Sequence, residues 1–415
     1  MTLLTRLMVF CLFVTTSTLT WASDDNELEE IKRNLADLVM RVAALEAENA
    51  ALKASKSSQP DLAAVPTDSQ AEMLKSGSWV DRIKLIGDFR YRYEGIDIQG
   101  SDDRERNRMR ARIGMVARVS DDLEVILGLA SGSDDPISTN QTLGRAGSSK
   151  NFGLDLAYLQ WSLSDLVSLR AGKFKNVWFK SEKSELMWDN DYNPEGFALS
   201  YQSDKGFLHG ALNWLESDTK QDQTFLLGVQ GGLVKQLSDT RLTAGLGYYE
   251  LAIAGREAIN RDEDYFGNGF TCSNIASPTD CQYSFDYEQF QVFVQAEFSL
   301  AGLPLVTFVE SVENLAVDDA DLAWSAGFRL GKAKVPGSWQ LGYQYLHLEA
   351  DAVLGLTSSS DFAGGGTGGK GHIFKGSWMM TENWSLALTW YANDQNMAAS
   401  SRNYRRIQVD TQIKF

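Results

Sequence analysis

Histidine, cysteine and proline are scarce in this chain of 415 residues, and it carries no excess of positive charge. Its three histidines, His209, His347 and His372, are far apart, so neither a histidine-based metal site nor a Ser-His hydrolase is expected. Asp and Glu number 55 against 39 Lys and Arg, whereas nucleic-acid-binding proteins normally carry a basic excess. No apolar run after residue 22 is long enough for a transmembrane helix. With 11 Trp, 14 Tyr and 20 Phe, the chain is too aromatic to be disordered.

The first 22 residues have the composition of a secretory signal peptide. Arg6 supplies the positive n-region, an apolar core follows, and Thr20-Trp21-Ala22 supplies a cleavage site with small residues at its first and third positions. Two cysteines remain after residue 22, Cys272 and Cys281, and both lie in a polar stretch. In an exported chain this arrangement predicts one disulfide that closes a loop, because a metal site would need more ligands.

Residues 23–53 are predicted to form a short α-helical coiled coil. Apolar residues recur there in alternating steps of three and four, which is the a/d pattern of a heptad repeat. The seam consists of Leu28, Ile31, Leu35, Leu38, Val42, Leu45, Asn49 and Leu52. The alternative is a single amphipathic helix packed on a domain, although the apolar stripe is narrow. Residues 54–78 lose the repeat and carry Ser, Pro, Gly and Gln, which predicts a flexible linker.

From Trp79 to Phe415, apolar and polar residues alternate with a period of two. Phe290, Val292 and Val294, for example, alternate with polar residues that are mostly glutamines. Long rows of this kind, with Arg and Gln on the second face, indicate strands with lipid on one side and water on the other. Short polar turns alternate with longer connections along the chain. Residues 79–415 are therefore predicted to form an all-β transmembrane domain, an antiparallel up-and-down β-barrel of about 16 strands.

The start of this region resembles a known family. The run Trp79-Val-Asp-Arg-Ile-Lys-Leu-Ile-Gly-Asp-Phe-Arg-Tyr-Arg92 is similar to the first barrel strand of a bacterial outer-membrane putative porin family. Similar matches follow at residues 106–114, 132–144, 154–161 and 171–176. Members of that family also carry a signal peptide and a short coiled coil ahead of the barrel. The resemblance implies a channel in the bacterial outer membrane, with no catalytic residues and no cofactor.

Several partners follow from these features. The chain ends on Phe415, an aromatic residue that closes an alternating strand, and this ending looks like the signal read by the bacterial barrel-assembly machinery. The barrel itself is expected to contact outer-membrane lipid. The heptad seam within residues 28–53 and the resemblance to porins together imply a homotrimer. The coiled coil is expected to lie in the periplasm, where it could also contact the cell wall.

Basic residues gather on three strands that barrel closure brings together. A charged side chain on the lipid face costs about 2–4 kcal/mol at mid-depth, so these residues are expected to face the lumen. The predicted pore-lining residues are Arg82, Lys84, Arg90, Arg92, Arg106, Arg108, Arg110, Arg112, Arg402, Arg406 and Lys414. Neighbouring acids such as Asp88, Glu94 and Asp410 are expected to neutralise part of this charge, but they are too few on these rows to cancel it.

The third long connection, near residues 176–195, is a candidate constriction loop. General porins fold their third loop into the pore, and acids placed there would face the arginines and create a transverse field. The candidates are Lys180, Glu182, Lys183, Glu185, Asp189 and Asp191. The glycine-rich run at residues 364–369 lacks the Lys-Ser/Thr pair of a phosphate loop, and it predicts a mobile outer loop.

These observations favour a porin that lets small hydrophilic solutes and ions diffuse passively across the outer membrane. Two alternatives remain open. One is a solute-specific channel with a preference for anions, and the other is a structural tether that joins the outer membrane to the cell wall through the coiled coil. Stepwise ohmic conductance in planar bilayers would indicate a porin. Saturation and block by a solute would indicate a specific channel, and a barrel that shows neither behaviour would indicate a tether. No enzymatic activity, cofactor or metal is expected.

The heptad seam generates a prediction about assembly. Deleting residues 28–53 should weaken the oligomer, because the seam contributes apolar contact between chains, while barrel contacts retain part of the assembly. Crosslinking and native mass spectrometry in mild detergent measure the effect. A full-length chain that is already monomeric in mild detergent, with no crosslinked species, would contradict the predicted trimer.

Overall fold

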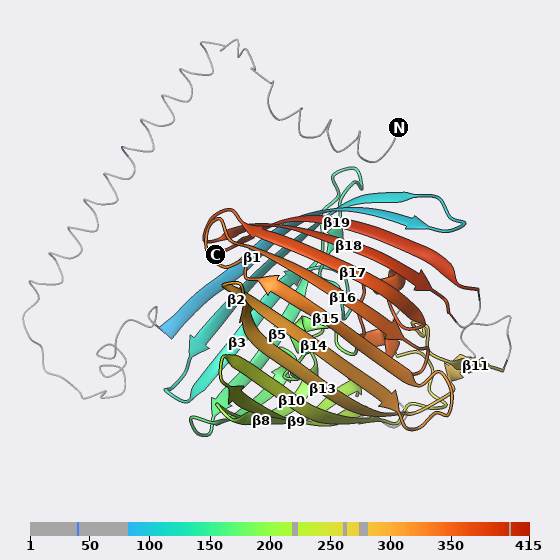
Figure 1. Ribbon diagram of the computed structural model, residues 1–415, viewed down its shortest axis with the longest axis horizontal. Coiled ribbons are helices and arrows are strands. Elements are labelled where there is room, and N and C mark those ends of the chain that lie inside the picture. The colour runs from blue at the N-terminus through green and yellow to red at the C-terminus, as the bar shows by residue number, and fades with distance from the viewer. Residues whose placement is uncertain (1–39, 41–81, 218–222, 260–263, 274–280, 398–399) are drawn as a thin grey trace, which may run out of the picture. The chain divides into compact units, whose positions relative to one another are not determined.

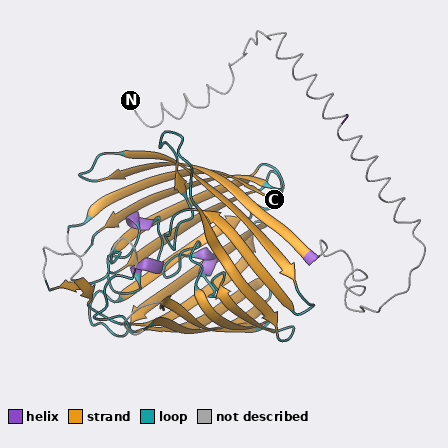
Figure 2. Ribbon diagram, turned by 180° about the vertical axis from the view of Figure 1, so that it is seen from behind, coloured by secondary structure: helices purple, strands orange, loops and turns teal. Residues whose placement is uncertain are grey.

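The computed structural model describes Met40 and residues 82–217, 223–259, 264–273, 281–397 and 400–415. The predicted signal peptide, coiled coil and linker lie outside the described residues, Met40 excepted. From residue 82 onward the described chain forms a β-barrel with obliquely running strands (Figures 1 and 2). Among the described residues, no helix has both the length and the apolar character needed to cross a membrane.

Sixteen long antiparallel strands form the barrel, and the predicted strand count is confirmed. They are β1 (Ile83–Ile98), β2 (Arg104–Arg118), β3 (Leu123–Ser131), β5 (Phe152–Ser162), β6 (Val167–Lys173), β7 (Glu195–Ser203), β8 (Gly206–Glu216), β9 (Thr224–Leu237), β10 (Thr240–Leu251), β13 (Tyr287–Leu300), β14 (Leu303–Asn314), β15 (Leu322–Gly331), β16 (Trp339–Leu348), β17 (Gly369–Met379), β18 (Trp384–Gln395) and β19 (Arg402–Lys414). A two-residue strand, β4 (Gln141–Thr142), pairs with β2, and β11 (Phe270–Cys272) pairs with β12 (Cys281–Tyr283) in a separate hairpin.

The barrel closes where its last strand pairs with its first. The register between β1 and β19 runs from the pair Asp88 and Lys414 to the pair Ile98 and Tyr404. At the end of the seam, Gly87 N donates to Phe415 O at 2.8 Å and Phe415 N donates to Gly87 O at 3.0 Å. A closed ring leaves no unpaired sheet edge, which is the condition for placing strands in hydrocarbon. Closure also places β19, β1 and β2 side by side, as predicted.

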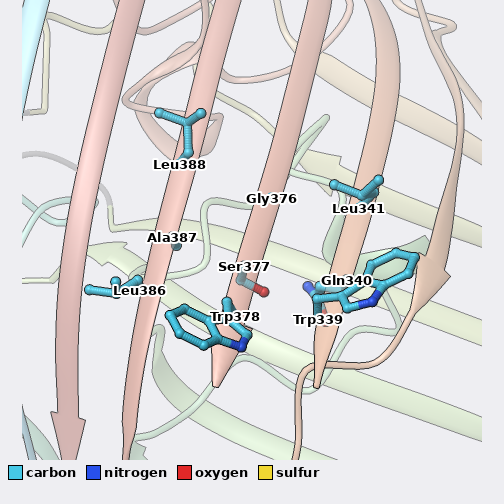
Figure 3. Close-up of a pocket in the computed structure, with 9 residues that line it drawn as sticks. All are labelled: Trp339, Gln340, Leu341, Gly376, Ser377, Trp378, Leu386, Ala387 and Leu388. Atoms are coloured by element: carbon cyan, nitrogen blue, oxygen red, sulfur yellow. The ribbon is translucent and has the colours of Figure 1, made fainter. Parts of the chain in front are cut away.

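The strands bury their polar side chains inside the barrel and expose their apolar side chains, which is the reverse of a water-soluble protein. On β13, Gln289, Gln291 and Gln295 are buried, whereas the alternating Phe290 and Val292 are exposed. Figure 3 shows the apolar outer surface of β16, β17 and β18, where a shallow groove of about 380 Å³ is lined mainly by tryptophan and leucine side chains. An apolar exterior around a polar interior is the pattern of an outer-membrane barrel.

Seven turns of two to seven residues alternate with eight loops, as predicted from the sequence, and four of these loops span 20 or more residues. These four long loops are numbered by their order among the eight: L2 (132–151), L3 (174–194), L5 (252–286) and L7 (349–368). In bacterial barrels the short turns lie on the periplasmic side. The predicted disulfide is confirmed, because Cys272 and Cys281 are joined within L5.

The glycine-rich run was expected to form a mobile outer loop, and this expectation is wrong. Thr367 is buried, its N–H donates to Phe266 O at 2.8 Å, and its hydroxyl donates to Ala350 O at 2.7 Å. Gly366 has a φ of +77°, and a Cβ there would lie 2.2 Å from Phe266 O. The glycines therefore allow the end of L7 to pack closely against the backbone of L5.

The orientation of the two strand faces generates a prediction about stability. Replacing the outward-facing Val292 near the middle of β13 with Arg should lower the free energy of unfolding by about 2–4 kcal/mol, because the charge is placed in hydrocarbon. The matched variant Leu300→Arg, on the same face at the end of the strand, should cost about 0–1 kcal/mol. Denaturant unfolding in lipid vesicles measures both values. Equal costs at the two positions would contradict the assignment of this face to lipid.

Candidate pore constriction

Arginines from three adjacent strands lie on the inner face of the barrel. Arg90 and Arg92 come from β1, the even-numbered arginines from 106 to 112 come from β2, and Arg406 comes from β19. Backbone pairing sets Arg90 opposite Arg110 and Arg92 opposite Arg108. Like charges that face each other across strands are destabilising, so this wall requires nearby carboxylates.

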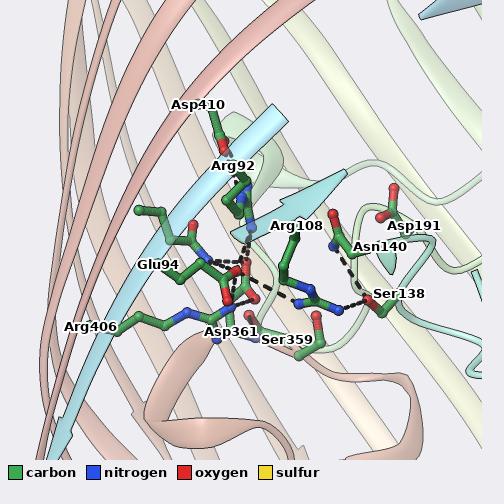
Figure 4. A network of polar contacts seen from close by, with 12 residues as sticks. Arg92, Glu94, Arg108, Ser138, Asn140, Asp191, Ser359, Asp361, Arg406 and Asp410 are labelled. Atoms are coloured by element: carbon green, nitrogen blue, oxygen red, sulfur yellow. Dashed lines mark hydrogen bonds and ion pairs between the residues drawn. The ribbon is translucent and has the colours of Figure 1, made fainter. Parts of the chain in front are cut away.

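Glu94 of β1 is the centre of the resulting network (Figure 4). Its side chain is fully buried and lies 2.7 Å from Arg406 Nη2, 3.6 Å from Arg92 Nη1 and 3.7 Å from Arg108 Nη1. Arg106 Nε also donates to Glu94 Oε2. One carboxylate thus interacts with guanidinium groups from all three strands, which ties the closure seam together on its inner side.

Two further wall carboxylates pair with the arginines beside them. Asp88 accepts from Arg110 at 2.9 Å and from Arg112 at 2.8 Å. Asp410 accepts from Arg92 Nε at 2.6 Å and from Arg92 Nη2 at 2.7 Å, which is the two-point geometry that makes Arg–carboxylate pairs strong.

The remaining two carboxylates come from loops. Asp191 of L3 lies 3.3 Å from Arg112 and 3.5 Å from Arg110, and Asp361 of L7 lies 2.7 Å from Arg406 and 3.2 Å from Arg92. Burial opposes the ionisation of Asp361, but Arg406 and Arg92 outweigh it and hold its pKa below the usual range. The pKa of Asp191 is likewise lowered, because its arginine partners outweigh the effect of burial.

Acids close to the wall are therefore more numerous than the strand rows alone predicted. Five carboxylates pair with six guanidinium groups, and two of these carboxylates belong to L3 and L7. Arg90 is the exception, because its Nη2 donates to Asn140 of L2 at 2.6 Å and no described carboxylate forms an ion pair with it. With Arg90 included, seven guanidinium groups face five carboxylates, so this cluster of arginines and acids retains two positive charges.

Four of the predicted pore-lining residues lie outside this network. Arg82 and Lys84 are exposed at the turn-bearing end of β1, and Lys414 is exposed at the same end of β19. Arg402 lies at the opposite end, where it donates to Gln99 O at 2.8 Å and to the Ser101 hydroxyl at 2.6 Å. The cluster is thus confined to the middle and loop-bearing parts of the three strands.

L3 folds into the barrel, where inward-facing glutamines of the opposite wall bind it. Phe179 N donates to Gln230 Oε1 of β9 at 2.7 Å, and Gln230 Nε2 donates to Phe179 O at 3.1 Å. Glu182 N donates to Gln295 of β13 at 3.0 Å. Because L3 leaves from β6 and returns to β7, these contacts show that it extends across the lumen.

Aromatic packing adds to these polar contacts. Trp178 of L3 packs edge-on against Tyr249 of β10, with ring centroids 5.0 Å apart, and Trp188 packs against the same ring at 5.4 Å. A Cβ at Gly228 would lie 2.8 Å from Trp178 Cζ2 and 2.7 Å from Tyr249 Cδ1. The missing side chain at Gly228 thus leaves the space that Trp178 occupies against the wall.

The candidate residues of L3 have different partners. Asp191 contacts the arginine wall directly, and the carboxylate of Glu182 pairs with Arg329 of β15 at 2.6 Å. Lys180 Nζ donates to Asn190 Oδ1 at 2.5 Å and to Trp188 O at 3.2 Å. The backbone carbonyl of Lys183 accepts from Asn190 Nδ2 at 3.4 Å. The expected separation of acids and arginines across a gap is therefore replaced, at Asp191, by direct contact.

The last two candidates join L3 to L7. Glu185 accepts from the Ser359 hydroxyl at 3.1 Å, and Asp189 Oδ2 accepts from Ser360 N at 2.9 Å. The backbone continues this contact, since Asp189 N donates to Thr357 O at 2.7 Å. Burial and the nearby Glu185 raise the pKa of Asp189. The two loops thus form one hydrogen-bonded unit inside the barrel.

The role of L7 was missed in the sequence analysis. It contains two single-turn 3-10 helices, η4 (Gly355–Thr357) and η5 (Phe362–Gly364), and η5 contacts β17, β18 and β19. Val353 and Phe362 are each only 1% exposed. The concentration of apolar side chains at 352–356 is the signal that L7 packs in an interior, because an exposed loop rarely carries such a run.

A closed barrel with an apolar exterior and a polar interior narrowed by its own loops defines an outer-membrane channel. Residues 97–268 and 268–415 match the family model described as "Putative porin". The chain belongs to this porin family, and it is an outer-membrane diffusion channel rather than an enzyme.

Comparison with solved structures finds the same fold in OprB of Pseudomonas putida. OprB of Pseudomonas putida in its high-pH structure is 12% identical, with a TM-score of 0.54 over 84% of this chain and 96% of that chain. OmpF of Salmonella typhi in complex with daunomycin is 12% identical, with a TM-score of 0.49 over 80% of this chain and 97% of that chain. OmpT of Vibrio cholerae with loop L8 deleted is 11% identical, with a TM-score of 0.48 over 80% and 99%. No curated protein matches the sequence.

The contact between L7 and the wall generates a prediction. In Asp361→Asn, Arg92 and Arg406 lose a charged partner. Because Asp361 is partly exposed, we expect a cost of about 1–2 kcal/mol, below the 3–5 kcal/mol of a fully buried pair, and therefore about tenfold faster amide hydrogen exchange in residues 355–365. Asp102→Asn, which changes an exposed carboxylate in the first loop, is the control.

The pH dependence of this exchange has a definite sign. A lowered carboxylate pKa contributes stability that is present above the ordinary Asp value of about 3.9 and is lost as the pH falls through the folded value. The difference in L7 protection between the unmodified protein and Asp361→Asn should therefore be the same at pH 7 and pH 5. Exchange that is unaffected by Asp361→Asn would show that the ion pairs do not hold L7.

Proposed function

We propose that this porin passes small hydrophilic solutes and ions through a lumen that L3 and L7 narrow. The observation that carries the proposal is the attachment of both loops to the inner wall, through Asp191 and Asp361 to the arginines and through Gln230 and Gln295 to the opposite strands. Such a channel should give stepwise, ohmic conductance in planar bilayers. A barrel that inserts but does not conduct would instead favour the structural tether.

We infer a weak preference for anions. The constriction retains two positive charges, whereas the sequence as a whole has a net charge of −16. At physiological salt the Debye length is about 8 Å, so charges on the outer rim are largely screened from groups deeper in the lumen. Charges that line a narrow constriction are screened less, and they should therefore set the permeability ratio.

We also propose that the coiled coil of residues 23–53 lies in the periplasm, joined by residues 54–78 to a barrel that begins at residue 79, and that the chain is a homotrimer. Support comes from topology. β1 begins at the end of the barrel that carries the short turns, since Ile83 pairs with Ala117 next to the turn at residues 119–122. In bacterial barrels this end faces the periplasm.

The inferred selectivity generates a prediction. Replacing Arg108 and Arg110 together with Gln removes two positive charges from the cluster and leaves it without net charge. The reversal potential in a salt gradient should shift toward cation preference. Arg405→Gln is the matched control, because Arg405 is exposed on the outward-facing row of β19 next to the buried Arg406.

The outcomes separate two explanations of the arginine wall. A shift in the double variant, with none in the control, supports a wall that sets selectivity. An unchanged reversal potential in the double variant would show that the arginines only hold the structure together.

A further inference from the structure

A partly open cavity lies inside the barrel, at the end that carries the short turns. It has a volume of about 440 Å³ and is bounded by residues of β5 to β8, the turn at residues 163–166 and the first residues of L3. This volume is within the range of small-molecule sites, about 300–1,000 Å³. None of the arginine-network residues lines it, so the cavity is distinct from that network.

One side of the cavity is aromatic. Phe179 of L3 stacks on Phe207 of β8 with ring centroids 5.4 Å apart and an interplanar angle of 28°. Phe293 of β13 packs behind both rings, at 5.0 Å from Phe179 and 6.3 Å from Phe207, and is only 1% exposed. Phe179 and Phe207 are themselves half-buried and line the cavity. Phe293 holds the pair in place, the ring of His209 stacks on Phe207 at 5.1 Å, and the two phenylalanines give this side of the cavity its apolar character.

Polar groups with unused hydrogen-bonding capacity line the same cavity. Arg170 Nε donates a hydrogen bond to Gln160 Oε1 at 3.0 Å, and Arg170 Nη1 donates one to Lys175 O at 3.2 Å. Its Nη2 has no partner among the described residues. His209 Nδ1 lies 2.9 Å from the Ser200 hydroxyl, so Nε2 is unused within the described chain.

Two amide side chains add to this set. Asn176 Nδ2 has no hydrogen-bond partner in the described part of the protein, although it is buried. The amide of the exposed Gln202 likewise makes no side-chain hydrogen bond to a described residue. The cavity therefore has guanidinium, imidazole and amide groups on one side and the aromatic pair on another.

We propose that this cavity is a binding subsite for a neutral sugar ring in transit through the channel, an inference that rests on the proposed function. A pyranose has an apolar C–H face that stacks on aromatic rings and an equatorial belt of hydroxyls that both donate and accept hydrogen bonds, which matches Phe179 and Phe207 together with Gln202 and Asn176. A carboxylate fits less well, because the bond from Arg170 Nε to Gln160 removes the Nε–Nη2 fork and because the carboxylate of Asp165 lines the same cavity.

The test is the block of ion current by sugar in planar bilayers. D-glucose added to the unmodified channel should reduce the current in a saturable manner. Phe207→Ala and Gln202→Ala should each raise the half-blocking concentration about tenfold, which corresponds to the loss of about 1.4 kcal/mol of binding. Leu208→Ala is the matched control, because Leu208 is adjacent on β8 and faces lipid, with 52% of its surface exposed. It should leave the half-blocking concentration unchanged.

Each outcome has a defined meaning. The absence of conductance would overturn the proposed function and this subsite together, whereas ohmic conductance without saturable glucose block would overturn the subsite alone. A stronger block by D-gluconate than by D-glucose, abolished by Arg170→Gln, would overturn the assignment to neutral sugars. If Phe207→Ala fails to fold, Gln202→Ala decides, since Gln202 is exposed. A half-blocking concentration unchanged in that variant would overturn the proposal.

Discussion

The bilayer core offers no hydrogen-bond partner to a backbone, and this constraint determines the rest of the molecule. A closed ring of strands satisfies it, and the ring is completed where Gly87 and Phe415 exchange backbone hydrogen bonds. Closure in lipid then requires one apolar face and one polar face on every strand. Away from the strand ends, the arginines of β1, β2 and β19 must therefore point inward, where they lie opposite one another.

This concentration of positive charge inside a small lumen explains why the loops fold inward. Arg90 faces Arg110 and Arg92 faces Arg108, so the wall is stable only when carboxylates lie between the guanidinium groups. The strands supply part of them, and L3 and L7 supply the rest through Asp191 and Asp361. Neutralising the wall and narrowing the pore are thus consequences of the same contacts. The aromatic packing of L3 and its bonds to lumen-facing glutamines hold the constriction from the other side.

Much of the fold could be predicted from the sequence, because strand alternation and turn spacing are local patterns. The orientation of the arginines could also be predicted, since the cost of a charge in lipid leaves one choice. Their partners could not, because Asp361 reaches Arg92 across 269 residues of chain and no local pattern encodes that contact. For the same reason the glycine-rich end of L7 was taken for a mobile loop, although its glycines serve close packing against L5.

The central claim is that carboxylates of L3 and L7 hold the two loops inside the lumen and thereby narrow it. The most direct test is the single-channel conductance of the double variant Asp191→Asn, Asp361→Asn, measured beside the unmodified protein at the same salt concentration. Loops released from the wall should leave a wider path, so the account predicts a larger conductance step. An unchanged step would show that the ion pairs do not set the width of the pore, and it would contradict the account.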